Sequence, residues 1–316
     1  MARIEWERLA KDPTIDILFA RCAFPEGRHA SEKARDNPGQ GKEEAAMQDK
    51  AELTGDTPEE QDEGTFDRLR LILGDEGIKR LADSTVTVLG LGGVGSNCAM
   101  ALARGGVGHL VLLDRDCVTP SNINRQAVAR RSTLGCPKAE VMREMVLDVN
   151  PDCEVTALRA FLDKDRIDEQ MAALPDPDWT VDAIDTISQK LRIALWAQET
   201  GHRLISSMGA GNKLDPTRLH IADISETYAD PIARTVRKEC RKRGIRKLEV
   251  VFSDETPMHF APPAGAELLA DGRPADRGVL LGTMSYMPAM MGYTIAGRVI
   301  CGLLGLQNEL DPFRTW

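Results

Sequence analysis

Residues 85–114 read TVTVLGLGGVGSNCAMALARGGVGHLVLLD, and this stretch decides the fold. Thr85–Leu89 is a short β-branched strand, and His109–Leu113 is a second one. Between them a turn leads into a helix of small residues over 94–104. The turn contains Gly90, Gly92, Gly93 and Gly95. Glycines here allow a tight turn and let the backbone approach a phosphate or a sugar, so the stretch predicts a nucleotide-binding βαβ unit.

Strand and helix patterns alternate on both sides of this unit. Helices are expected over 66–82, 138–149, 163–173 and 187–200, and strands over 154–158, 179–184 and 203–207. After residue 209 the pattern is less regular, with strands at 218–222 and 248–252 and helices at 231–243 and 285–304. Such alternation predicts an α/β fold with a Rossmann-like, mostly parallel sheet, helices on both faces and an irregular C-terminal extension.

The first 64 residues differ from the rest of the chain. Ser31–Gly64 consists mainly of Glu, Asp, Lys, Gln, Gly and Pro and has no apolar period. Such a segment cannot bury enough surface to offset the entropy lost on ordering. We therefore expect residues 1–64 to be a disordered, acidic N-terminal extension. Met47 is an alternative start, which would make residues 1–46 an upstream segment.

The composition is that of an ordinary globular protein, with 42% apolar and 28% charged residues among 316. A net charge of −9 argues mildly against a protein that coats nucleic acid. The seven cysteines form no CxxC pair, so zinc-ribbon spacing is absent and reduced thiols are expected.

The start of the chain lacks the apolar core of a secretion signal, which predicts a cytoplasmic protein. Val279–Gly297 carries no charge, but its Gly, Pro, Ser, Thr and Tyr residues make it a poor membrane span. We expect a buried or partner-facing helix there and no stable membrane span.

Asp114 ends the second strand, 19 residues after Gly95. A carboxylate at this place can accept hydrogen bonds from ribose hydroxyls. The glycine turn and Asp114 together fit an NAD enzyme as well as an ATP enzyme.

Residues 114–126, DRDCVTPSNINRQ, separate these two readings. A dehydrogenase has no need for an Asn-x-x-Arg-Gln cluster directly after the ribose carboxylate, whereas a triphosphate does. Arg125 can clamp phosphate oxygens as a fork, and Asn122 can donate to them. Lys138 opens the next helix, where its ammonium can reach the β- or γ-phosphate. The cluster therefore favours ATP.

Two carboxylates, Asp182 and Asp185, lie at the carboxyl end of a later expected strand. Ligands of open α/β sheets bind at this edge. Because Mg²⁺ prefers oxygen ligands and phosphates, a carboxylate here predicts a magnesium site.

These motifs resemble the E1-like adenylyltransferase superfamily of ubiquitin-activating and ThiF/MoeB-type enzymes. The similar segments are FDRLRLILG (66–74), GLGGVGS (90–96), DRDCVTPSNINRQ (114–126), GCPKAE (135–140) and DAID (182–185). The resemblance implies that ATP and Mg²⁺ are used to activate a carboxylate as its AMP ester. It assigns the ribose to Asp114, Mg²⁺ to Asp185, and the phosphates to Asn122, Arg125, Gln126 and Lys138. It also implies a homodimer in which Arg68 reaches into the partner subunit's site.

The second half of the chain is similar to the tRNA threonylcarbamoyladenosine dehydratase branch. The similar segments are SMGAGNKLDPT (207–217), IADISETYADPIARTVR (221–237), VVFSDETP (250–257) and LGTMSYMPAMMG (281–292). The CxxC pairs of sulfur-carrier activators are missing, and there is no room for the catalytic-cysteine domain of ubiquitin activators. One departure is that Val250 and Val251 stand where some members carry a cysteine.

The branch implies ATP-dependent cyclisation of N6-threonylcarbamoyladenosine in tRNA through an acyl-adenylate, with release of AMP and pyrophosphate. Arg125, Lys138 and Arg68 would be the catalytic residues. Related enzymes imply a cysteine desulfurase or sulfur-acceptor partner. The expected domain covers 65–308, with a nucleotide core at 65–215, a tRNA and dimer segment at 216–308, and a tail at 309–316.

Arg234–Lys247 contains eight cations opposed by Glu239 alone. This density suggests contact with RNA phosphates, and a solvated helix face is the alternative. Cys240 lies in this segment and is interpreted as incidental. The competing functions are activation of a ubiquitin-like or sulfur-carrier protein at its C-terminus, a silent adaptor, and an NAD oxidoreductase.

Overall fold

The computed structural model describes residues 15–17, 64–260 and 281–306. Most of the predicted N-terminal extension, residues 261–280 and the predicted tail at 309–316 lie outside the described residues. The domain boundaries at 64 and 308 therefore stay predictions.

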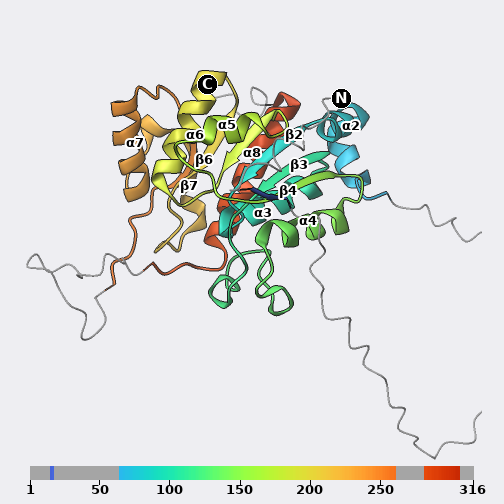
Figure 1. Cartoon of the computed structure of the whole chain (residues 1–316), viewed down its shortest axis with the longest axis horizontal. Coiled ribbons are helices and arrows are strands. Elements are labelled where there is room, and N and C mark those ends of the chain that lie inside the picture. Colours follow the sequence, from blue (N-terminus) through green and yellow to red (C-terminus); the bar gives the residue numbers. More distant parts are fainter. Residues whose placement is uncertain (1–14, 18–63, 261–280, 307–316) are drawn as a thin grey trace, which may run out of the picture.

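One eight-stranded sheet forms the centre of the molecule (Figure 1). Its strand order is β1-β4-β3-β2-β5-β6-β8-β7. The pairs from β4 to β8 are parallel, whereas the edge strands β1 and β7 run antiparallel. The strands are β1 (Ile15–Ile17), β2 (Thr85–Leu89), β3 (His109–Leu113), β4 (Glu154–Ala160), β5 (Trp179–Asp182), β6 (Leu204–Ser207), β7 (Leu219–Asp223) and β8 (Glu249–Ser253).

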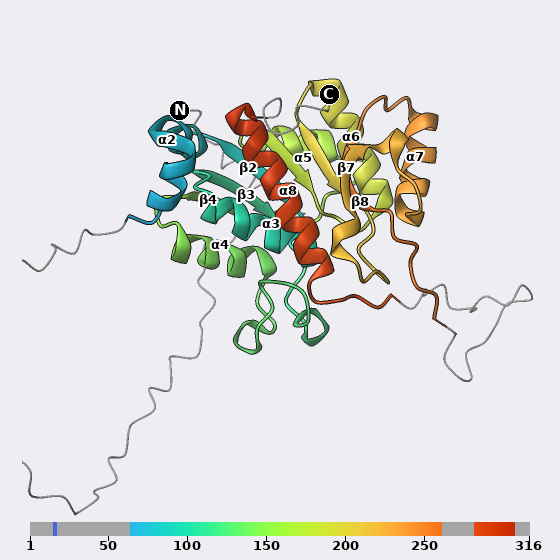
Figure 2. The same ribbon diagram turned by 180° about the vertical axis from the view of Figure 1, so that it is seen from behind.

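Helices cover both faces of the sheet, which confirms the predicted fold class. α3, α4 and α8 lie on the face seen in Figure 2, and α5, α6 and α7 lie on the other face. The helices are α2 (Asp67–Ala82), α3 (Gly93–Arg104), α4 (Lys138–Val149), α5 (Ile167–Ala172), α6 (Ile187–Thr200), α7 (Pro231–Arg243) and α8 (Met287–Leu304).

Alternate residues of the central strands enter two separate cores. In β3, Leu110 and Leu112 pack in the core beneath α3, α4 and α8, whereas Val111 and Leu113 pack in the core beneath α5 and α6. Successive side chains of a strand point to opposite faces, so a strand covered on both sides needs an unbroken apolar run. The run HLVLL supplies it.

Helix α8 closes the fold by packing directly against α3. A Cβ built on Gly292 would lie 2.4 Å from the carbonyl oxygen of Val94, and one built on Gly93 would lie 2.8 Å from Cβ of Pro288. Glycine is therefore needed on both helices for this approach. By length and composition α8 could cross a membrane, but half of it is buried in the molecule. This agrees with the expected buried helix.

Most other element ends lie within two residues of the prediction, and three differences are larger. α5 begins at Ile167 instead of residue 163, because the Asp163 carboxylate accepts from the backbone N–H of Asp165 (3.0 Å) and makes a turn. α2 is interrupted at Gly74, where φ is +66°. β1 lies inside the expected extension and pairs with β4; three residues are too few for a readable strand pattern.

Candidate functional site

The glycine-rich loop joins β2 to α3 at the carboxyl edge of the sheet. Gly90 has a φ of +87°, a conformation that favours glycine. A Cβ on Gly95 would lie 1.8 Å from the carbonyl oxygen of Gly90, so a side chain there would displace the loop. Within the described residues no side chain caps the N-terminus of α3, which begins at Gly93. Its first N–H groups therefore remain available to a phosphate.

Asp114 is buried beside this loop, with 8% of its surface exposed. One carboxylate oxygen accepts from the backbone N–H of Leu91 (2.6 Å), and the other accepts from that of Asp116 (2.8 Å). Burial raises the pKa of Asp114, and the nearby Lys138 ammonium opposes this shift. Asp114 thus holds the glycine loop in place, and each oxygen keeps a lone pair for a ribose hydroxyl.

Lys138 is the first residue of α4, and its side chain is 7% exposed. Its Nζ lies 3.3 Å from a carboxylate oxygen of Asp116, whose side chain is 55% exposed. The backbone N–H of Lys138 also donates to the Asp116 carbonyl oxygen (3.0 Å). The ammonium is therefore held near Asp114 by a partner that faces solvent, an arrangement that lets a phosphate take that partner's place.

Arg125 and Gln126 approach the glycine loop from the crossover that follows β3. A Cβ on Gly93 would lie 3.4 Å from Cγ of Arg125, and one on Gly92 would lie 3.9 Å from Nε2 of Gln126. Gln126 is 8% exposed, and its Oε1 has no hydrogen-bond partner among the described residues. A buried oxygen without a hydrogen bond is costly, so Oε1 of Gln126 could accept one from a bound nucleotide or from a water molecule beside it.

Local hydrogen bonds hold this segment in shape. The Arg125 guanidinium donates to the carbonyl oxygen of Ser121 and to Oδ1 of Asn124, both at 2.8 Å. Oδ1 of Asn122 accepts from the backbone N–H of Thr119 (3.1 Å). Asn122 therefore orders the turn with its oxygen, and its amide nitrogen has no partner in the described part of the chain.

The two carboxylates at the end of β5 have different environments. Asp182 is fully buried, and its Oδ2 lies 3.1 Å from Nζ of Lys190 and accepts from Ser206 Oγ at 2.6 Å. Asp185 is exposed in the following loop, where Thr186 Oγ1 donates to it (3.3 Å). Asp182 is thus engaged in a buried ion pair, and Asp185 is the carboxylate that is accessible to a metal ion.

No group of three or more His, Cys, Asp or Glu side chains converges for a metal ion among the residues that the structure describes. Asp185 offers a single carboxylate, which is compatible with Mg²⁺ because this ion commonly takes one or two carboxylates and completes its shell with phosphates and water.

Arg68 lies apart from these residues. It is exposed in the first turn of α2. Phe66, two positions earlier, approaches Gly106 in the turn that leads into β3. Arg68 therefore lies at the amino edge of the sheet, whereas the glycine loop, Asp114, Lys138 and Arg125 meet at the carboxyl edge. Within one chain the structure does not bring Arg68 to the site.

The contacts that join distant segments next to the site were not predicted from the sequence. Nζ of Lys213, 1% exposed, donates to Asp230 Oδ2 (2.6 Å) and to the carbonyl oxygen of Ser253 (3.1 Å). This buried pair ties the loop after β6 to the start of α7. Nδ2 of Asn124 donates to the carbonyl oxygen of Thr283 (2.9 Å), which joins the Arg125 segment to the chain before α8. A lysine inside the uncharged run SMGAGNK was the available signal.

Comparison with known proteins identifies the family of the chain. The ThiF family profile matches residues 66–315. The tRNA threonylcarbamoyladenosine dehydratase of Bacillus subtilis is 42% identical over 241 residues, which cover 76% of this chain and 94% of that protein. The molybdopterin-synthase adenylyltransferase of Escherichia coli is 39% identical over 114 residues, but these cover 36% of this chain and 44% of that protein.

A solved structure is similar over most of the chain. The E. coli tRNA N6-threonylcarbamoyladenosine dehydratase in complex with ATP superposes with a TM-score of 0.67 and 27% identity, covering 78% of this chain and 96% of that chain. The similarity thus extends through the tRNA-modifying relatives and is shorter in the carrier-activating one. The chain belongs to the ThiF family and, within it, to the tRNA threonylcarbamoyladenosine dehydratases.

Proposed function

We propose that this protein uses ATP to dehydrate N6-threonylcarbamoyladenosine in tRNA by cyclisation, and that it acts in the cytoplasm. The observation that carries the proposal is the match to a dehydratase over 94% of that relative's length. The site agrees with it, because the glycine loop, Asp114, Arg125 and Lys138 meet at one edge of the sheet.

We assign ATP to this edge. Asp114 would accept hydrogen bonds from the ribose hydroxyls, beside Gly90, Gly92, Gly93 and Gly95. Arg125 and Lys138 would neutralise the phosphates, and the amides of Asn122 and Gln126 would donate to them. The guanidinium fork and the buried ammonium suit phosphate oxygens, because charge-assisted hydrogen bonds gain strength away from bulk water.

The reaction has two steps. The threonyl carboxylate of the modified nucleoside attacks the α-phosphorus of ATP, which forms the acyl-adenylate and releases pyrophosphate. The carbamoyl group of the same modification then attacks the acyl carbon, closes the ring and releases AMP. One carboxylate oxygen leaves with AMP, so the RNA loses one water. Arg125 and Lys138 would stabilise the charge that develops on the phosphates. The substrate supplies both nucleophiles, which agrees with Val250 and Val251 at the place where some members carry a cysteine.

Asp185 would hold Mg²⁺ at this edge. When bound, the ion supplies neutralisation of phosphate charge. Asp182 is not available for this role because it is buried against Lys190.

A homodimer would bring Arg68 to the site of the partner subunit. Large apolar side chains are exposed on both helices: Leu71 (89%) and Ile72 (81%) on α2, and Met290 (43%) and Tyr293 (47%) on α8. Apolar side chains exposed to this extent are available for a contact between subunits. If Arg68 acts across the dimer, mixing inactive Arg68→Ala and Lys138→Ala subunits should restore about a quarter of the wild-type rate, since half of the dimers then hold one complete site. No recovery, in a mixture shown to exchange subunits, would contradict this assignment.

The segment from residue 216 to 308 would provide the tRNA contacts, and a cysteine desulfurase or sulfur acceptor would be a further partner. A pull-down with a desulfurase tests the latter point.

Mass spectrometry of nucleosides tests the proposed reaction. Threonylcarbamoyl-modified tRNA is incubated with the protein, ATP and Mg²⁺. The modified adenosine should lose the mass of one water, matched by AMP formation. Unchanged tRNA, from a preparation that exchanges pyrophosphate into ATP when given a small carrier protein, would contradict the proposal and favour carrier activation.

A further inference from the structure

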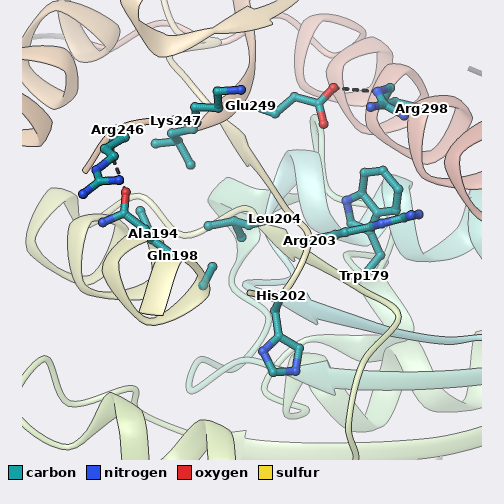
Figure 3. A pocket seen from close by; sticks show the side chains of 12 residues that line it. Trp179, Ala194, Gln198, His202, Arg203, Leu204, Arg246, Lys247, Glu249 and Arg298 are labelled. Carbon is teal, nitrogen blue, oxygen red and sulfur yellow. Dashed lines mark hydrogen bonds and ion pairs between the residues drawn. The ribbon is translucent and has the colours of Figure 1, made fainter. Parts of the chain in front are cut away.

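An open pocket of about 490 Å³ lies at the amino edge of the sheet (Figure 3). It lies between the starts of β5, β6 and β8, the end of α6 and the side of α8. Its charged and aromatic lining consists of Trp179, His202, Arg203, Arg246, Lys247, Glu249 and Arg298. Since β2, β5, β6 and β8 are parallel, this pocket is at the opposite edge of the sheet from the glycine loop. Strands of about five residues separate the two edges by roughly 17 Å.

Trp179 gathers two guanidinium groups at this pocket. Cζ of Arg203 lies 5.3 Å and Cζ of Arg298 lies 5.0 Å from the centre of its ring. Arg298 also pairs with Glu249 (2.6 Å), and these two charges balance. Arg203 has no carboxylate within ion-pair distance among the described residues. The cation–π contact and a hydrogen bond from Nη1 of Arg203 to the carbonyl oxygen of Gly302 (3.3 Å) therefore hold a planar guanidinium without a carboxylate partner at the pocket wall.

The structure divides the basic segment Arg234–Lys247 into two kinds of cation. Arg237 donates to Thr227, and Lys242 and Arg243 pair with Glu239. The remaining cations are exposed and form no ion pair within 4 Å in the described part of the chain: Arg234, Lys238, Arg241, Arg246 and Lys247. Of these, Arg246 and Lys247 line the pocket. Together with Arg203 they bring three unbalanced positive charges to one cavity of a protein whose net charge is −9.

We propose that this pocket is a second phosphate-binding site and that it takes a backbone phosphate of the tRNA away from the modified nucleoside. The inference rests on the proposed function. An arginine fork and two further cations around one cavity match the geometry and charge of a phosphate. Phosphate contacts position a nucleic acid without reading its sequence. A site across the sheet would thus fix the orientation of the RNA while its modified base lies at the ATP site.

The double variant Arg246→Gln/Lys247→Gln tests this site. Its matched control is Lys79→Gln/Arg80→Gln, an adjacent exposed pair on α2 that removes the same charge. Binding of tRNA is measured as a function of salt. In the pocket variant the affinity should fall roughly ten-fold and the slope of log K against log salt should lose about one unit, while the control stays near wild type. Because the contact is to backbone, modified and unmodified tRNA should lose affinity equally. ATP affinity should not change.

Three outcomes would overturn the inference. The pocket variant could match the control in affinity and slope. It could weaken modified tRNA alone, which would place the contact at the nucleoside. It could keep tRNA affinity but lose binding of inorganic phosphate seen with wild type, which would assign the pocket to a free anion. In each case wild-type protein that still removes water from the modified tRNA would leave the proposed function intact.

Discussion

Lys190 and Lys138 are both buried at the same edge of the sheet, but their carboxylate partners differ in exposure to solvent. At the end of β5, Lys190 (3% exposed) faces Asp182 (0% exposed), and Ser206 completes the group. At the end of β3, Lys138 (7% exposed) faces Asp116, which is 55% exposed. The first pair is closed within the protein, and the second is open to solvent on one side.

The closed pair therefore has a structural role, whereas the open pair can take part in the reaction. Removing one member of a closed pair leaves an uncompensated charge in the core, which is strongly destabilising. A half-open pair is screened by water and contributes little to stability, but its cation can transfer to a phosphate. The following changes test this comparison, in order of decreasing effect.

Lys190→Ala should lower the free energy of unfolding by about 3–5 kcal/mol, because Asp182 is left buried without its partner. Urea unfolding followed by circular dichroism measures this change. The double variant Lys190→Met/Asp182→Leu is the control and should recover most of the loss, since both charges are then gone. A single variant as stable as wild type would show that the pair is not closed.

Lys138→Ala should reduce AMP formation on modified tRNA by about 10²–10³-fold, because one cation at the developing charge is lost. Its melting temperature should stay close to that of wild type, since Asp116, the carboxylate that loses its ion pair, faces water. Turnover and thermal unfolding are measured on one preparation. Normal turnover would remove Lys138 from the phosphate site.

Asp116→Asn should change the free energy of unfolding by no more than about 1 kcal/mol, because the Asp116 carboxylate is more than half exposed and water screens its ion pair with Lys138. Asp182→Asn, in the closed pair, serves as its counterpart and should be far more destabilising. If urea unfolding shows that both variants lose the same free energy of unfolding, the two pairs do not differ in the way proposed.

The smallest expected effect is a pH dependence at Asp114. Burial raises its pKa, so the folded protein holds this proton more tightly than the unfolded chain does. Its contribution to stability is therefore present at low pH and is lost as the pH rises through the folded pKa, above the ordinary value of 3.8. In Asp114→Asn this dependence disappears. As the pH rises through the acidic range, the unfolding free energy of the wild type should therefore fall relative to that of Asp114→Asn. A rise of the wild type relative to the variant would contradict the assignment.

Local patterns predicted much of the fold. The bounds of β2, β3, α4, α6 and α7 agree with the expected ranges, because apolar runs and caps act over neighbouring residues. The glycine loop, Asp114 and Lys138 were also predictable, since they follow consecutive elements. Contacts between distant segments were not. Nothing in the spacing indicates that Lys213 pairs with Asp230, or that Asp182 rather than Asp185 is buried.

The amino-edge pocket illustrates the same limit. Arg203, Lys247 and Arg298 are far apart in the sequence, and they meet because β5, β6 and β8 start at one edge. Arg234–Lys247 was readable as a basic segment, but its division into paired and unpaired cations depends on where Glu239 and Thr227 lie in the fold.

The close approach of Pro288 and Gly292 on α8 to Gly93 and Val94 also sets an order of events during synthesis. The glycine loop leaves the ribosome about 200 residues before the helix that packs against it. At ordinary elongation rates that interval is roughly 10–40 s. During it, the apolar face of α3 has no covering helix from its own chain. A nascent chain halted before Met287 would thus expose this face to chaperones.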